Sequence, residues 1–243
     1  MKSRLPTKLT ITGLLMLLQS CGNINKGSDA DIDPYKEYNK KMFVINQEID
    51  KDVTRPIAKA YEEVMPDIFE KRITNFFDNL YNITTISNDI LQGEMLLAAS
   101  DSWRFLLNST FGIAGLFDVA TINDFPKHNQ YFGITLAKWG FVDSPYIVLP
   151  IFGSSTMYDA ISIPVDNIAL SAWPYIKPTY LKTSLLVLDS TNKRASILPY
   201  DKAVEEAFDP YIFVRNAYLQ KRKKLIDESI YYKNNEEYLN TND

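Results

Sequence analysis

The 243-residue sequence contains one cysteine, Cys21, and one histidine, His128. An internal disulfide needs two cysteines, so the fold must rest on packing even in an oxidising compartment. The usual zinc and iron–sulfur sites need several Cys and His ligands, which this chain lacks. We therefore expect no metal and no cofactor, and carboxylates are the remaining candidates for catalysis.

The sequence also lacks an apolar run at its start that is long enough to cross a membrane. The run from Leu9 to Leu18 has ten residues, whereas a membrane-spanning helix needs roughly 20. It follows Lys2, Arg4 and Lys8 and ends in small and polar residues, which is the pattern of a secretory signal. An ordinary buried helix fits poorly because this run is apolar all round. We predict a signal peptide over residues 1–20.

The residues around the cysteine resemble the lipobox of bacterial lipoproteins. Leu18-Gln19-Ser20-Cys21 has the expected Leu, small residue and Cys, and only Gln19 departs from the usual small or β-branched residue. The resemblance implies lipid attachment at Cys21, and Gly22 after it implies delivery to the outer membrane. A free catalytic thiol is the weaker alternative, because such a thiol needs an activating base and His128 is 107 positions away.

Negative charge dominates once the signal is removed. The loss of Lys2, Arg4 and Lys8 leaves 23 basic residues against 30 acidic ones, a net charge of −7 over 223 residues. Nucleic-acid affinity comes mainly from Lys and Arg that neutralise phosphates, so we expect no nucleic-acid partner. Recruitment to anionic lipid by a basic surface is disfavoured for the same reason. The mature length suits one domain.

Helical patterns dominate that domain, and strand patterns are scarce. Residues 21–32 are polar and read as a flexible tether, 33–228 form the helical domain, and the polar residues 229–243 are expected to be disordered. Asp33 and Asp209 each precede a Pro and are expected to cap helices. Further helices are predicted at 67–80, opened by an Asp67-x-x-Glu70 capping box, and at 94–110, 180–197 and 209–226, with a kink or break at Arg55-Pro56. We expect a mainly α chain.

Apolar residues at helical spacing predict the inward faces of two of these helices. On the first they are Ile68, Phe69, Ile73, Phe76, Phe77 and Leu80. On the second they are Leu96, Ala99, Trp103 and Leu106. The spacing of three and four residues places each set on one side of its helix.

Residues 139–176 contain no Lys or Arg, and their aromatic content is high. Pro145, Pro150 and Pro164 exclude one straight helix. Two interpretations remain open from composition. One is a buried hairpin in a globular core, and the other is an interfacial or re-entrant element that faces lipid. Irregular backbone at membrane depth needs surrounding protein or a water-filled cavity, so the second interpretation implies a scaffold or a pore.

Several stretches together resemble the MlaA/VacJ family of outer-membrane lipoproteins. In order along the chain they are DPYKEYNKKMFVINQEID with VTRPIAKAY (33–61), ITNFFDNL (73–80), NDILQG (88–93), WRFLLNSTFGIAGLFDVA (103–120), FGITLAKWG (132–140), SPYIVLPIFGSSTMYD (144–159) and DPYIFVRNAYLQKRKKLI (209–226). The resemblance implies a single domain of amphipathic helices that form a membrane-embedded ring with a hydrophobic hairpin. It further implies a periplasmic-face, lipid-anchored position in the outer membrane beside a porin trimer.

The function implied by the resemblance is not enzymatic. Mislocalised phospholipids would leave the outer leaflet through an amphipathic channel and pass to a soluble periplasmic lipid carrier, which maintains lipid asymmetry. Asn75 and Phe76 match an Asn-Phe pair of the family's ring helix. The family's hairpin motif is matched by Gly140, Pro145, Tyr146, Pro150 and Gly153. Core packing and turn geometry are the alternative roles for these residues.

The chain departs from the family pattern around the hairpin. Ala137 and Ser144 stand where the family often has Gly, which argues against large backbone changes there. Tyr158 stands where the family has an Arg, which removes a possible partner of Asp159. Two other functions stay open. One is a non-transporting structural lipoprotein that scaffolds a porin or envelope complex, and the other is a carboxylate-based envelope hydrolase, for which the sequence offers no specific pair of acids.

Overall fold

The computed structural model describes the backbone of residues 32–240 and the side chains of residues 32–230. The predicted signal peptide, Cys21 and nearly all of the predicted tether lie outside the described residues. The elements are α3 (Lys36–Ile49), η2 (Asp50–Thr54), α4 (Arg55–Val64), α5 (Asp67–Gln92), α6 (Met95–Thr110), α7 (Val119–Ile122), α8 (Phe132–Lys138), β1 (Tyr146–Leu149), β2 (Gly153–Thr156), α9 (Met157–Ile168), η3 (Trp173–Tyr175), α10 (Thr179–Ser196), η4 (Leu198–Tyr200), α11 (Asp201–Glu205) and α12 (Pro210–Asn240). The expected mainly α fold is confirmed.

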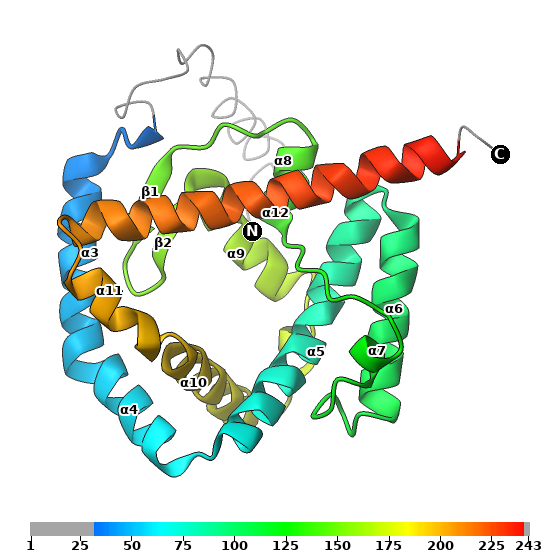
Figure 1. Ribbon diagram of the computed structural model, residues 1–243, viewed down its shortest axis with the longest axis horizontal. Coiled ribbons are helices and arrows are strands. Elements are labelled where there is room, and N and C mark those ends of the chain that lie inside the picture. Colours follow the sequence, from blue (N-terminus) through cyan, green and yellow to red (C-terminus); the bar gives the residue numbers. More distant parts are fainter. Residues whose placement is uncertain (1–31, 241–243) are drawn as a thin grey trace, which may run out of the picture.

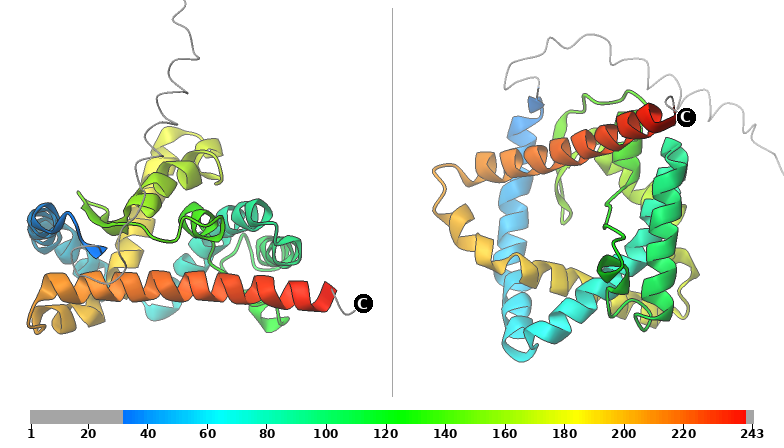
Figure 2. Two further views of the ribbon diagram at one scale, coloured as in Figure 1. Left: turned by 90° about the horizontal axis from the view of Figure 1, so that it is seen from above. Right: turned by 45° about the vertical axis from the view of Figure 1, so that its right-hand side comes forward.

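The helices form a ring rather than a bundle (Figure 1). Helices α3, α4 and α5 make successive sides, α12 closes the ring, and α10 returns inside it. Seen edge-on, the ring is flat, and α9 with the chain that follows it projects from one face (Figure 2). Helix α6 packs along α5 as an antiparallel neighbour.

Polar side chains fill the inside of the α5–α6 pair, contrary to the expected inward faces. Ile68 and Phe69 are 59% and 58% exposed, and Phe77 is the buried apolar residue of α5. Buried instead are Asn79, Asn82, Thr84, Thr85, Asn88 and Asp89 of α5 and Asp101, Arg104 and Asn108 of α6. The prediction assumed that apolar faces turn toward the protein. In this fold many of them turn outward.

The helix boundaries confirm some of the predicted local signals. Asp209 caps α12, since its Oδ1 accepts from the backbone N of Ile212 at 3.1 Å. Helix α5 begins at Asp67 as expected. No side chain caps it, so the prediction of an Asp67-x-x-Glu70 capping box was wrong. The predicted irregularity at Arg55-Pro56 is a change of direction without a break: the π-helical segment Asp50–Thr54 joins α3 to α4, which lie along different sides of the ring.

Helix α12 ties the ring together through two Tyr–Arg pairs on its inner face. Tyr211 and Arg215 both contact the carboxylate of Asp33, so Asp33 fixes α12 instead of capping α3, whose N-cap is Tyr35. Two small apolar clusters lie on the same face, around Tyr146 and around Ile134. The helix continues to Asn240, so the expected disordered tail from residue 229 is helical over most of its length.

Strands β1 and β2 pair antiparallel and form a hairpin inside the ring. Tyr146 and Val148 are buried against α3 and α12, while the tip residues Ile151 and Phe152 are 78% and 71% exposed. The hairpin therefore has a buried base and an exposed tip. Within residues 32–240, no helix is both long and apolar enough to cross a membrane.

Candidate functional site

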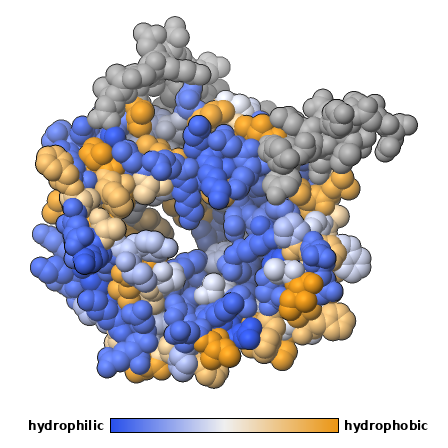
Figure 3. Space-filling view, in the orientation of Figure 1, coloured by the Kyte–Doolittle hydropathy of each residue, from blue (hydrophilic) through white to orange (hydrophobic). Residues whose placement is uncertain are grey.

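A cavity of about 690 Å³ lies inside the ring, between α3, α4, the hairpin, α10 and α11. The space-filling view shows an opening through the molecule near its centre (Figure 3). A volume of this size is typical of a ligand pocket, in the range of roughly 300–1,000 Å³. Apolar side chains supply much of the lining, namely Phe43, Ile49, Ile57, Val148, Ile151, Leu186, Val187, Ile197, Val204 and Val214.

Four charged residues gather on one side of this cavity. Arg194 of α10 binds Asp50 through Nε at 2.6 Å and Asp201 through Nη2 at 2.8 Å. Arg55 lies 3.1 Å from Asp50 and 3.4 Å from Asp201 through its Nε, and its guanidinium also pairs with Glu205. The network joins the π-helical segment to α10 and α11. The lining of the cavity therefore combines a cluster of paired charges with many apolar side chains.

The network keeps the carboxylate of Asp50 ionised. Burial alone would raise the pKa of Asp50, but hydrogen bonds from Arg194, Thr54 and Arg55 outweigh it and lower the pKa to about 2. The guanidinium of Arg194 has its pKa raised above the ordinary value, chiefly by its hydrogen bond to Asp50. These charges are fixed at every physiological pH.

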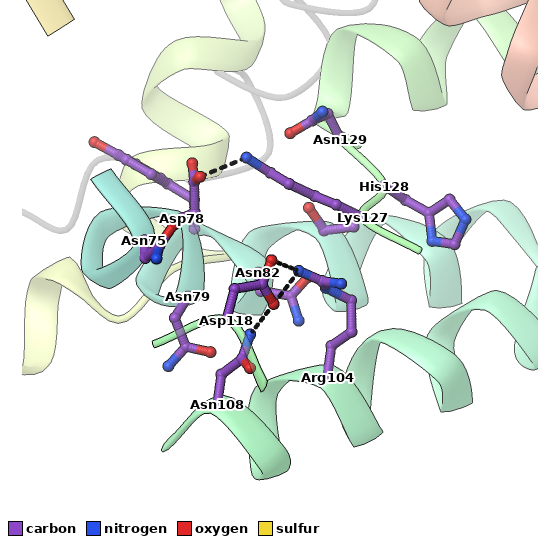
Figure 4. A pocket seen from close by; sticks show the side chains of 12 residues that line it. Asn75, Asp78, Asn79, Asn82, Arg104, Asn108, Asp118, Lys127, His128 and Asn129 are labelled. Carbon is purple, nitrogen blue, oxygen red and sulfur yellow. Dashed lines mark hydrogen bonds and ion pairs between the residues drawn. The ribbon is translucent and has the colours of Figure 1, made fainter. Parts of the chain in front are cut away.

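A second pocket, lined by polar and charged side chains, lies where α5, α6 and residues 118–129 meet (Figure 4). Two ion pairs cross it, from Lys127 to Asp78 at 2.6 Å and from Arg104 to Asp118 at 3.0 Å. Its volume is about 30 Å³, which is room for about one or two waters. The pocket is too small for a lipid headgroup, so its polar groups serve the packing of α5 on α6.

Two buried acids face each other near the end of the α5–α6 pair. Asp89 and Asp101 are both fully buried, and Asp101 Oδ2 lies 2.9 Å from Nδ1 of His128. Burial, and next the negative charge of Asp101, raise the pKa of Asp89 to about 8. A protonated Asp89 can share its proton with Asp101. No bound substrate can reach this pair from outside, because both side chains are covered.

The structure separates the two sets of predicted site residues. Asn75 lines the small polar pocket and donates to the carbonyl of Leu116 at 3.2 Å. Phe76 packs edge-on against Phe77, with ring centroids 5.2 Å apart. Neither residue lines the large cavity. A channel role for this pair stays a prediction.

The hairpin residues lie closer to the cavity. Gly153 lines it and has φ +78° in the turn, a conformation that favours glycine. Gly140, with φ +103°, ends α8, and its N–H donates to Ala137. Pro145 accepts from the backbone N of Met157 at 2.9 Å, and Pro150 accepts from Phe152 at 2.8 Å. Pro145, Pro150 and Gly153 shape the hairpin, whereas Gly140 lies outside it, after α8.

The surroundings of Tyr146 and Asp159 differ from those that the sequence suggested. Tyr146 is fully buried in the cluster with Val148 and Tyr211, and its hydroxyl lies 2.8 Å from Ser154 Oγ. Asp159 does not lack a basic partner, since Arg222 of α12 lies 2.9 Å away. The pairing crosses 63 positions of sequence, which explains why a local motif did not reveal it.

Sequence reasoning missed the residues that most define the cavity, Asn46, Arg194 and Asp50. Asn46 interrupts an apolar stripe that includes Met42, Ile45 and Ile49 of α3, and a polar residue on such a stripe was the available signal. Arg194 and Asp50 are 144 positions apart. No spacing rule connects residues at that separation.

Comparisons with known proteins agree with this architecture. The family model of the MlaA lipoprotein matches residues 31–225. The intermembrane phospholipid transport system lipoprotein MlaA of Escherichia coli K12 is 30% identical over 230 residues, which cover 91% of this chain and 88% of that protein. An uncharacterised protein of Rickettsia conorii is 35% identical over 201 residues, 80% of each chain.

A solved structure described as the structural basis for maintenance of bacterial outer membrane lipid asymmetry shares the fold. It superposes with a TM-score of 0.69 at 30% identity, and the match covers 80% of this chain and 98% of that one. The family match extends over nearly the whole helical ring. The chain belongs to the MlaA lipoprotein family.

Proposed function

We propose that this protein removes mislocalised phospholipids from the outer leaflet of the outer membrane and passes them to a soluble periplasmic carrier. The observation that carries the proposal is a cavity whose lining combines a cluster of paired charges with many apolar side chains. Two further observations support it, namely the open centre of the ring and the phospholipid transport named for the relative at 30% identity.

The cavity suits an amphipathic passenger. A headgroup that crosses hydrocarbon alone leaves charged and polar atoms without hydrogen-bond partners, which is expensive. Inside the cavity, the same headgroup would meet charges of both signs, on Asp50, Arg55, Arg194 and Asp201. The acyl chains would follow the apolar lining. No covalent step is needed, so the proposal describes a transporter and not an enzyme.

The outer surface of the ring suits a lipid environment. Trp103 of α6, Phe111 at the C-terminal end of the same helix and Ile168 of α9 are 57%, 73% and 71% exposed. Such extensive exposed apolar surface marks interaction sites or lipid contact. Buried polar residues between α5 and α6 fit the same setting, since polar side chains join helices where apolar faces turn to lipid. We infer that the ring lies in the inner leaflet, with a trimeric porin as its neighbour.

The lipid anchor completes the proposed location. Attachment of acyl chains at Cys21 would hold the ring on the periplasmic face of the outer membrane, since each buried methylene contributes about 0.8 kcal/mol. Cys21→Ser tests this step. We expect the wild-type chain to fractionate with the outer membrane and the variant to lose its bound lipid and much of that association. The anchor would be contradicted if both chains fractionated alike and if neither had a mass above that of its unlipidated polypeptide.

Deleting the gene tests the proposed transport. We expect more phospholipid in the outer leaflet, measured as raised outer-membrane phospholipase activity and detergent sensitivity, and we expect the wild-type gene to reverse both. Unchanged outer-leaflet phospholipid in the deletion strain would contradict transport and favour a structural lipoprotein. Measuring porin abundance in the same strains separates a lost scaffold from a lost passage.

A further inference from the structure

Two asparagine side chains of α3 bind the backbone of the hairpin, Asn39 at strand β1 and Asn46 at the end of β1 and in the turn that follows it. Strand β1 pairs with β2 and also contacts α3. The amide of Asn39 donates to the carbonyl of Tyr146 at 3.1 Å and accepts from the N–H of Val148 at 2.8 Å. The amide of Asn46 donates to the carbonyl of Leu149 at 2.9 Å and accepts from the N–H of Ile151 at 2.8 Å.

Each amide therefore satisfies one C=O and one N–H of the hairpin backbone. An Asn side chain carries one carbonyl acceptor and an NH₂ donor group, so it can satisfy an N–H and a C=O of one strand at once. The two asparagines are seven residues apart on α3, about 10.5 Å along the helix. The bound carbonyls, of Tyr146 and Leu149, are three residues apart, about 10 Å along a strand. The two spacings match.

We propose that Asn39 and Asn46 form a two-amide clasp that fixes the hairpin as one wall of the cavity. Val148, Ile151, Gly153 and Ser154 of the hairpin all line that cavity, so the clasp determines its shape. The two asparagines are positioning residues. The consequence for lipid passage rests on the proposed function, whereas the placement of the hairpin does not.

The two halves of the clasp have different strength. Asn39 is fully buried, and its amide also donates to Asp33 at 2.8 Å. Asn46 binds near the exposed tip and is only partly buried. A two-stranded hairpin is at best marginally stable without further packing. We therefore place the control of the tip at Asn46 and the attachment of the base at Asn39 and the cluster around Tyr146.

A spin label at the hairpin tip tests the clasp directly. The label is attached to Phe152→Cys, whose native side chain is exposed, in a full chain whose Cys21 is lipidated or replaced by serine. We expect Asn46→Ala to make the label clearly more mobile, with a several-fold shorter rotational correlation time. Gln47→Ala is the matched control, because Gln47 also lines the cavity, and it should leave the mobility unchanged.

Asn46→Asp adds a pH test that a merely structural role would not pass. An ionised carboxylate can accept from Ile151 but cannot donate to Leu149, whereas the protonated acid can do both. A free Asp has a pKa of about 3.9, and a facing carbonyl raises it. We expect the label to be mobile at about pH 7.5 and held at about pH 4 in this variant, and to be held at both pH values in the wild type.

The results separate the clasp from the proposed transport. Unchanged label mobility in Asn46→Ala, together with no pH response in Asn46→Asp, would overturn the clasp whatever the protein transports. A mobile tip in a strain whose outer-leaflet phospholipid stays normal would support the clasp and contradict its role in passage.

Discussion

Arg222 on α12 and Asp159 on α9 form a buried ion pair, with Nε of the arginine 2.9 Å from Oδ2 of the carboxylate and both side chains 7% exposed. The hydroxyl of Tyr218 donates to the same oxygen. Seven residues earlier, Tyr211 and Arg215 bind Asp33 in the same way. The repeated Tyr-x-x-x-Arg pattern fastens α12 to two distant parts of the chain and so closes the ring.

Removing Arg222 should loosen that closure. Arg222→Met leaves Asp159 buried without its ion-pair partner, which costs about 3–5 kcal/mol for a buried pair. We expect urea unfolding in detergent to show a loss of that order. Lys223→Met, at an exposed neighbouring position, should change stability by less than about 0.5 kcal/mol. Equal stability of the Arg222→Met variant and the wild type would show that α12 is held by other contacts.

Gly133 of α8 leaves the space that Asp159 occupies. A Cβ at this position would lie 2.2 Å from Asp159 Oδ1 and 2.7 Å from the ring of Tyr131. We expect Gly133→Ala to destabilise the fold by about 1–3 kcal/mol, as overpacking does. Because the change displaces Asp159, its cost should not add to that of Arg222→Met. Thermal unfolding of both single variants and the double variant measures this, and strict additivity would disprove the shared cause.

Asp89 should make stability fall as the pH rises. Its pKa is about 8 in the fold, raised by burial and by Asp101, and about 3.8 in the unfolded chain. Between these values the folded state holds a proton that the unfolded state has lost. The stabilising contribution is therefore fully present below about pH 4 and is lost as the pH rises to 8, by at most about 1.4 kcal/mol per pH unit.

The variant Asp89→Asn tests this sign. The neutral amide keeps a donor for Asp101 but cannot ionise, so the slope of unfolding free energy against pH should become flatter between pH 5 and 8. Denaturant unfolding at several pH values measures the slope, and Asp78→Asn, a partly exposed acid of the same helix, is the control. A slope that Asp89→Asn leaves unchanged would mean that Asp89 is ionised in the fold.

The sequence allowed the helical class and the starts of α5, α6, α10 and α12 to be predicted, because caps, prolines and apolar spacing act locally. It did not allow the direction of the helix faces to be predicted. Ile68 and Trp103 follow the spacing of core residues, yet they are 59% and 57% exposed, which fits the lipid environment that we propose for the ring. The cavity was also beyond local reasoning, since Asp50 and Arg194 meet only after the ring closes.

The most direct measurement of the central claim is to fill the cavity and follow outer-leaflet phospholipid. Val187 lines the cavity, and its side chain is 61% exposed. Val187→Trp should therefore obstruct the passage without disturbing a packed core. Ser184→Trp is the matched control, since Ser184 is an exposed residue of α10 outside the lining. In a deletion strain that expresses each variant at equal level, Ser184→Trp should restore low outer-leaflet phospholipid as the wild type does, and Val187→Trp should not. Full restoration by Val187→Trp would contradict passage through this cavity.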